Sequence, residues 1–180
     1  MNDVMHQAAL AIPLDERSRN LRRMAVKTLE SGKRAHLGSA MSIMEIIRVL
    51  YDDFLIINPE KSDDPLRDRF ILSKGHGCLA QYVVLADKGF YDNKELLKFC
   101  HADSILGGHP EYGKIPGVEA STGALGHGLP IGVGMALASR LQKRKSRVVV
   151  LVGDGEINEC SVWEAAMAGP HYKLDNLIAI

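Results

Sequence analysis

The chain has 180 residues, which suits one domain with a sizeable core, because domains usually hold roughly 100–200 residues. Its 22 basic and 22 acidic side chains balance, so no charge excess indicates a nucleic-acid partner or an acidic tail. Apolar runs such as 148–152 are far shorter than the roughly 18 residues that a membrane span needs, and the N-terminus lacks the pattern of a secretory signal. Three well-separated cysteines, an odd number, indicate reduced thiols in a cytoplasmic protein.

The first part of the chain is predicted to be mainly helical. We expect a loose N-terminal arm over residues 1–14 and one domain over residues 15–180. A short strand is predicted over 69–72, and Ser39 or Ser42 is available to cap the helix that follows them. The helices predicted in this part cover residues 15–31, 41–54, 79–88 and 94–101.

The last third of the chain has the clearest pattern. The glycine-rich segment over 104–128 is predicted to be a long loop, and loops of that length inside a domain are usually functional or disordered. A helix is expected after it, over 130–142. The apolar, β-branched run 148–152 is typical of a parallel strand that is buried on both faces. A helix over 159–171 follows, and a second buried strand begins at 177–180. Helices that alternate with buried strands predict an open α/β fold, with a mainly parallel sheet and helices on both faces.

Two glycine-framed motifs, at residues 73–77 and 153–155, fall at the carboxyl ends of predicted strands. Open parallel sheets bind their ligands at those ends, so the coincidence predicts a site. The carboxylate of Asp154 would hold Mg²⁺ or Ca²⁺, while nearby amides and a helix N-terminus would bind phosphate oxygens. The alternative is a turn aspartate that caps the following helix, and Gly-Asp-Gly alone does not exclude it.

Glycines and histidines also gather in the central loops. The chain has no P-loop sequence, and the glycines over 123–128 are in the wrong order for a dinucleotide fingerprint. These glycines still mark a place where the backbone must pass close to another group. A lone loop histidine is usually a solvated surface group, but here four occur in separate glycine-rich turns. Because histidine donates or accepts near neutral pH, the group suits polyhydroxylated or phosphorylated substrates. The four are His36, His76, His109 and His127.

Four blocks occur in order along the chain: His36-Leu37-Gly38, residues 68–77, residues 108–111 leading to 121–126, and Gly153-Asp154-Gly155 followed by Glu159, residues 163–166 and residues 174–179. Together they resemble the transketolase family over residues 15–180. This similarity implies the thiamine diphosphate-binding fold, and in particular the N-terminal subunit of split transketolases, in which two chains share the enzyme. Leu37, Ala124 and His127 depart from the residues that are common in the family, which leaves the sugar specificity more open than the cofactor.

The resemblance implies roles for single residues. Asp154 would bind the metal, Mg²⁺ or Ca²⁺, and the backbone of Gly155 would contact the diphosphate of thiamine diphosphate. His36 and His109 would be catalytic residues that face the donor sugar. Glu159 would lie at a dimer contact that links two cofactor sites, and it would also be a first-turn carboxylate favoured by the helix dipole. The other implied cofactor contacts are His76, Gly123, Ala124 and Leu125.

The implied reaction is transfer of a two-carbon ketol unit from a ketose phosphate to an aldose phosphate. The family's metal-binding asparagine falls just past Ile180, so we expect the domain to be incomplete at its C-terminal end. A separate C-terminal subunit would carry the pyrimidine-binding domain with the glutamate that activates the cofactor, in a dimer or heterotetramer. We therefore expect the chain alone to be inactive. A deoxyxylulose-phosphate synthase-like enzyme and an inert module that only docks a partner are the alternatives.

Overall fold

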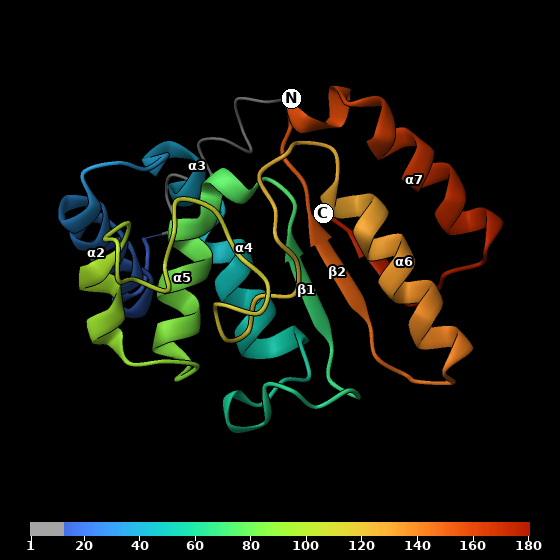
Figure 1. Cartoon of the computed structure of the whole chain (residues 1–180), viewed down its shortest axis with the longest axis horizontal. Helices are drawn as coiled ribbons and strands as arrows, with labels where there is room; N and C mark the ends of the chain where they lie inside the picture. The colour runs from blue at the N-terminus through green and yellow to red at the C-terminus, as the bar shows by residue number, and fades with distance from the viewer. Residues whose placement is uncertain (1–12) are drawn as a thin grey trace.

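Figure 1 shows the computed structural model of the chain, which describes residues 13–180. Three parallel strands form one sheet with helices on both faces, so the predicted open α/β architecture is confirmed. Most of the predicted arm, residues 1–14, lies outside the described residues. The strands, in their order across the sheet, are β1 (Arg69–Leu72), β2 (Val148–Leu151) and β3 (Leu177–Ala179).

The helices lie in two layers with the sheet between them (Figure 1). Helices α2, α4 and α5 form the core on one face, and α6 and α7 form it on the other. Within residues 13–180, no helix is long and apolar enough to cross a membrane. The helices are α2 (Glu16–Gly32), α3 (Leu37–Met41), α4 (Met44–Val49), α5 (Cys78–Asp87), α6 (Gly128–Leu141) and α7 (Cys160–His171).

Side chains of the strands alternate between the two layers, because successive residues of a strand point to opposite faces. Phe70 and Val149 pair in register and face α2, α4 and α5. Ile71 and Val150, the next pair, face α6 and α7. All four residues of β2 are buried, as the β-branched run predicted for a strand covered on both faces.

The helix predicted over 41–54 is present only from Met44, because a turn at residues 42 and 43 separates it from the short helix α3. The chain forms α3, then a turn, then α4, and ends in a π-helical turn at Leu50–Phe54. Neither predicted cap is used, because the Ser42 hydroxyl donates to the carbonyl of Ser39 and Ile43 begins α4 without a side-chain cap. Such local serine hydrogen bonds compete with helix continuation.

Smaller differences concern the ends of elements. The predicted helix over 94–101 is a 3₁₀ turn at Asn93–Lys98. Glu159 is the N-cap residue of α7, one position before the first turn in which it was expected, and its side chain makes no capping hydrogen bond. The other predicted strands and helices are present, with bounds that differ by one or two residues.

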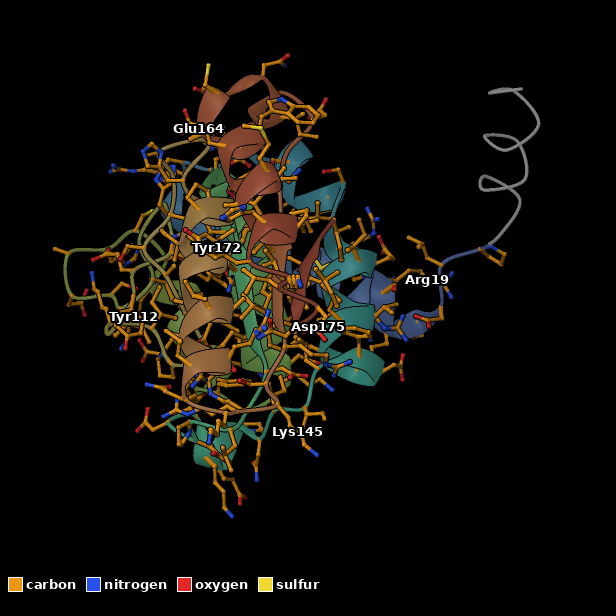
Figure 2. All side chains as sticks on the ribbon, turned by 90° about the vertical axis from the view of Figure 1, so that its right-hand side faces the viewer. Arg19, Tyr112, Lys145, Glu164, Tyr172 and Asp175 are labelled. Atoms are coloured by element: carbon orange, nitrogen blue, oxygen red, sulfur yellow. The ribbon has the colours of Figure 1, made fainter. Side chains whose placement is uncertain are left out.

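The strands all begin at one end of the molecule and finish at the other. In Figure 2, Lys145 lies at the end where the strands begin, and Glu164 of α7 lies at the end where they finish. Helices α6 and α7 pack side by side over the face of the sheet that carries Ile71 and Val150. At the finishing end Leu72 pairs with Leu151, so the two glycine-framed motifs that follow these strands start next to each other.

Candidate functional site

A cavity of about 450 Å³ opens at the carboxyl ends of β1 and β2. Four segments that are far apart in the sequence line it, and both glycine-framed motifs are among them. A cavity is therefore present at the edge of the sheet where the ligand-binding residues were predicted to gather. The lining residues are Gly38, Ser39, Ser42, Lys74, His76, Leu125, Gly153, Asp154, Gly155 and Glu156.

Three of the predicted histidines cluster at this edge. The rings of His36 and His76 meet edge to face with their centroids 5.2 Å apart. The ring of His109 lies against Gly123, where a Cβ would be 2.6 Å from the imidazole Cδ2. Burial lowers the pKa of His76, and the positive charges of His36, Lys74 and His109 lower it further. His76 is therefore held as the neutral imidazole near pH 7, able both to donate and to accept.

The glycine-rich loop over 122–127 approaches the start of α7 closely. Gly126 has φ +83°, and a Cβ there would lie 2.5 Å from Ser161 Oγ and 2.6 Å from Glu159 Cβ. The Ser161 hydroxyl donates to the Gly126 carbonyl at 2.8 Å, and the Thr122 hydroxyl donates to the Leu72 carbonyl at 2.7 Å. The loop thus joins the end of β1 to the start of α7, beside the cavity.

Glu156 is hydrogen-bonded to three segments around the cavity and was not among the predicted site residues. It is 2% exposed. Its Oε1 accepts hydrogen bonds from the Ser73 hydroxyl at 2.5 Å and from the Gly126 amide at 2.9 Å. Its Oε2 accepts one from the Gly153 amide at 2.9 Å. The only sequence signal is a charged residue directly after Gly-Asp-Gly at a strand end.

Lys74 and Ser39 are two further residues that sequence reasoning did not assign to the site. Lys74 is only 9% exposed, and its Nζ lies 3.3 Å from Ser42 Oγ. Ser39 Oγ is buried and has no hydrogen-bond partner among the described residues. The cavity therefore offers a fixed positive charge and an unused hydroxyl, which suits an anionic ligand.

Asp154 is exposed at the mouth of the same cavity, with Gly155 beside it. Within residues 13–180, no group of three or more His, Cys, Asp or Glu side chains is placed to hold a metal ion. Mg²⁺ takes roughly six oxygen ligands, so Asp154 would need oxygens from a ligand and from water. A phosphate-bearing ligand in the cavity would supply such oxygens.

Some predicted residues lie beside the cavity rather than in it. Ala124 is exposed between Gly123 and Leu125, and only Leu125 of these three lines the cavity. Glu159 is exposed and contacts the loop at Gly126. His127, the fourth histidine of the predicted group, is also exposed, with its Nδ1 3.0 Å from the carbonyl of Leu125.

Comparison with known proteins decides the family. Residues 15–180 match the family described as "Transketolase, thiamine diphosphate binding domain". The chain belongs to the transketolase family. The resemblance seen in the four sequence blocks is therefore confirmed, and the cavity lies in a thiamine diphosphate-binding domain.

Individual relatives agree with this assignment to the transketolase family. An apulose-4-phosphate transketolase subunit from Phocaeicola vulgatus is 44% identical over 167 residues, which are 93% of this chain and 59% of that protein. The 6-deoxy-6-sulfo-D-fructose transketolase subunit SqwG of a Clostridium species is 34% identical over 168 residues, 93% of this chain and 61% of that protein. The structure of transketolase from Leishmania mexicana matches with a TM-score of 0.81 and 32% identity, over 90% of this chain and 26% of that one. The chain thus spans 59–61% of the length of these two transketolase subunits.

Proposed function

We propose that this transketolase-family chain is the diphosphate-binding part of an enzyme that transfers a two-carbon ketol unit from a ketose phosphate to an aldose phosphate. The relatives named as transketolase subunits support the reaction class. The observation that carries the proposal is the single cavity that brings Asp154 and Gly155 together with Lys74 and His76. These relatives favour neither a deoxyxylulose-phosphate synthase nor an inert docking module.

The cavity residues divide into groups suited to different parts of thiamine diphosphate. Asp154 would bind Mg²⁺ or Ca²⁺, and the Gly155 backbone and the Lys74 ammonium would bind diphosphate oxygens. The hydroxyl of Ser39, which has no partner among residues 13–180, would gain a hydrogen bond from such a ligand. When bound, thiamine diphosphate supplies the carbanion chemistry of the reaction. The remaining cofactor contacts in this proposal are His76, Gly123, Ala124 and Leu125.

His36 and His109 are proposed to bind the donor sugar. Both are exposed, and both are close enough to His76 to lower its pKa. Imidazole nitrogens at this position would hydrogen-bond sugar hydroxyls and hold or move a proton during the transfer. Their place beside the cavity, rather than within it, leaves room for cofactor and substrate to meet.

A second chain is proposed to complete the enzyme. Helix α7 begins next to the site and exposes two large apolar side chains, Trp163 at 58% and Met167 at 67%. Apolar side chains exposed in this way are typical of surfaces that another protein covers. We infer a dimer or heterotetramer with Glu159 at a contact, in which a separate C-terminal subunit carries the pyrimidine-binding domain and its activating glutamate. This chain alone would then be inactive.

We further propose that the complex works in the cytoplasm. The cysteines Cys78, Cys100 and Cys160 are all free thiols. Unpaired cysteines are usual in reducing compartments, whereas secreted proteins usually pair theirs. Fractionation of the source cells would test this, and recovery of the protein outside the cytoplasm would contradict it.

Calorimetry on the full-length chain, expressed together with its partner subunit, tests the proposal. We expect thiamine diphosphate to bind in the presence of Mg²⁺, and the complex to transfer a ketol unit that the chain alone does not transfer. Asp154→Ala should weaken Mg²⁺-dependent binding by about 100-fold, since a metal-bound diphosphate loses its anchor on the protein. Asp175→Ala is the matched control, an exposed carboxylate just before β3 that should leave binding unchanged.

Two outcomes would contradict the proposal. One is tight cofactor binding that Asp154→Ala leaves intact. The other is a cofactor-loaded complex that transfers no ketol unit from any ketose phosphate.

A further inference from the structure

We propose that Glu156 is a positioning residue whose buried carboxylate fixes three separate segments in the shape that binds the cofactor. The inference rests on the function proposed above and goes beyond it. It assigns a role to a side chain that makes hydrogen bonds within the protein and needs no contact with the substrate. It also explains why a carboxylate should be buried at the end of a sheet where an anionic ligand is expected.

The three hydrogen-bond donors to Glu156 come from three segments of the cavity wall. Ser73 follows β1, Gly126 lies in the glycine-rich loop, and Gly153 lies just after β2. Each donor is the immediate chain neighbour of a residue that lines the cavity. A shift of any donor would therefore move a group that faces the ligand. The three neighbours are Lys74, Leu125 and Asp154.

The carboxylate acts through hydrogen bonds and not through an ion pair. In the described part of the chain, no ion pair involves Glu156, although 13 others are present. A buried charge is tolerated only when its hydrogen bonds are made, and bonds to a charged acceptor are about twice as strong as neutral ones. Two of the donors are backbone amides, which cannot rotate away. The carboxylate thus sets where the backbone of Gly126 and Gly153 lies.

Lys74 is held in place by the same arrangement. Its side chain packs over Gly153, where a Cβ would lie 3.2 Å from Lys74 Cδ. The Ser73 hydroxyl, which donates to Glu156, also accepts a hydrogen bond from the Gly128 amide at 3.1 Å. Lys74, the buried cationic residue that lines the cavity, is therefore tied through its neighbours to Glu156.

Glu156→Gln separates this role from simple space filling, because the carboxamide has nearly the same shape. Its single oxygen can face the Gly126 amide or the Gly153 amide, but not both. In either orientation its NH₂ group opposes a backbone donor. One wall of the cavity must then move, and the affinity for the ligand should fall even though the fold remains.

The test measures the dissociation constant of thiamine diphosphate with Mg²⁺, on the full-length chain in complex with its partner subunit. We expect Glu156→Gln to weaken binding by on the order of tenfold or more, the effect of one buried donor left unsatisfied. The apparent KM for the cofactor should rise, while kcat at saturating cofactor stays close to that of the unchanged enzyme. This division is not expected from a general loss of stability.

Asp68→Asn is the matched control. Asp68 is also a carboxylate at 2% exposure, and it also accepts backbone hydrogen bonds, from the amides of Ile56 and Arg147. It lies at the opposite end of the strands, just before β1. Asp68→Asn should lower the thermal unfolding temperature at least as much as Glu156→Gln, because both variants leave a buried backbone donor without an acceptor. Its cofactor affinity should nevertheless stay within about twofold of the wild type.

Unchanged cofactor affinity in Glu156→Gln would overturn the inference, and so would an affinity that falls equally in Asp68→Asn. If Glu156→Gln does not fold, Ser73→Ala keeps the carboxylate and removes one donor. We expect it to weaken binding by a smaller factor, and unchanged affinity there counts against the inference. A wild-type complex that binds no cofactor would instead refute the proposed function. If the wild type binds the cofactor and transfers a ketol unit, and neither Glu156→Gln nor Ser73→Ala changes the cofactor affinity, only the role of Glu156 is refuted.

Discussion

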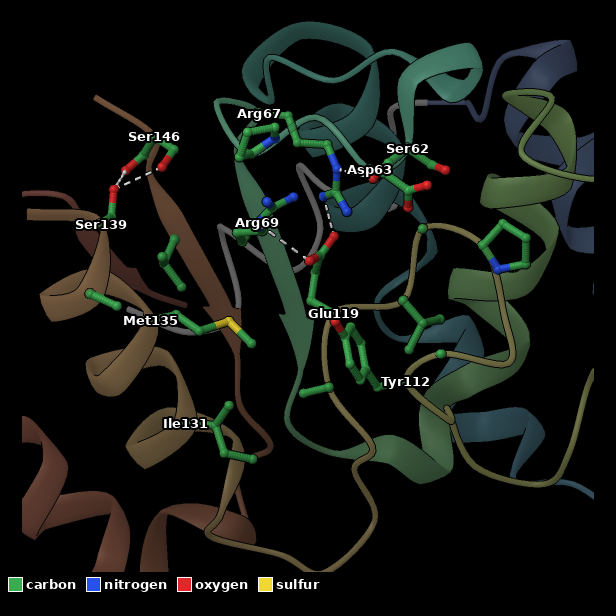
Figure 3. Close-up of a pocket in the computed structure, with 18 of the residues that line it drawn as sticks. Ser62, Asp63, Arg67, Arg69, Tyr112, Glu119, Ile131, Met135, Ser139 and Ser146 are labelled. Atoms are coloured by element: carbon green, nitrogen blue, oxygen red, sulfur yellow. Dashed lines mark hydrogen bonds and ion pairs between the residues drawn. The ribbon is translucent and has the colours of Figure 1, made fainter. Parts of the chain in front are cut away.

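At the amino ends of the strands, buried carboxylates are paired with arginine, whereas at the carboxyl ends Glu156 accepts hydrogen bonds from neutral donors and forms no ion pair within residues 13–180. Asp68 forms an ion pair with Arg147 at 2.6 Å. Figure 3 shows Glu119 between Arg67 and Arg69, with ion pairs to both. Burial raises the pKa of Glu119, and Arg67 opposes this. The charges of the amino end are thus largely compensated within the protein.

Two cavities, one at each end of the strands, differ in the same way. The larger, about 1010 Å³, lies beside the first residues of β1 and β2 and contains Glu119 with its arginines (Figure 3). Arg69 keeps one buried nitrogen without a partner there, but its guanidinium already pairs with Glu119 and donates to the Asp64 carbonyl. The smaller cavity, about 450 Å³, holds Lys74, which pairs with no carboxylate among the described residues, and the unused hydroxyl of Ser39. The smaller cavity is therefore distinguished by polar groups that are available to a ligand, and not by its volume.

Gly126→Ala should produce the largest loss of stability, at the carboxyl end. The left-handed φ of +83° and contacts of 2.5 and 2.6 Å to a Cβ leave no space for a methyl group. Backbone strain and overpacking together should cost about 3–5 kcal/mol of unfolding free energy, measured by chemical denaturation. Gly134→Ala is the control, since in the described part of the chain no atom beyond its neighbours and the backbone of α6 lies within 4 Å of a Cβ there. It should stabilise the protein by about 0.5–1 kcal/mol. Equal effects of the two variants would contradict the close packing of the loop.

Asp68→Asn should have the next largest effect and should affect only the amino end. It removes the ion pair with Arg147, while the asparagine oxygen still accepts one backbone hydrogen bond. Arg147 is 30% exposed and can be rehydrated, so the loss should be about 1–3 kcal/mol rather than that of a fully buried pair. Denaturation with and without thiamine diphosphate and Mg²⁺ measures it. If the cofactor no longer stabilised this variant, the two ends of the sheet would not be independent.

The predictable part of the molecule is the part that local sequence determines. The run at Val148–Leu151 required a strand buried on both faces, and the glycines at its end placed a site there. The break between α3 and α4 was missed because it depends on the conformation of Ser42 and Ile43, not on apolar spacing. The separate roles of His36 and His109 in catalysis, like those of the other site residues, remain predictions.

Glu156 shows why the rest of the site could not be predicted. A glutamate after Gly-Asp-Gly ordinarily points to solvent, and nothing nearby in the sequence marks it as buried. Its burial depends on donors at Ser73 and Gly126, which are 83 and 30 residues away. Only the folded backbone brings those donors together. Long-range satisfaction of a buried charge is therefore the feature that sequence reasoning lacked.

The pH dependence of stability should be the smallest effect, and it should arise at the carboxyl end through His76. The folded protein holds the pKa of His76 below its ordinary value of 6.5, chiefly through burial and then through the charges of His36 and Lys74. The unfolded chain therefore binds the proton at a higher pH than the folded one. Stability from this residue is present above about pH 6.5 and is lost as the pH falls through the range below it.

Unfolding free energies of the cofactor-free complex, measured from about pH 7.5 to 5, would show this loss as a steeper decline than in His76→Asn. His101→Asn serves as the control, because His101 is exposed on a loop and does not line the cavity. It should keep the wild-type slope. If His76→Asn declined as steeply as the wild type, the folded protein would not lower the pKa of His76, and the electrostatic difference between the two ends would rest on Lys74.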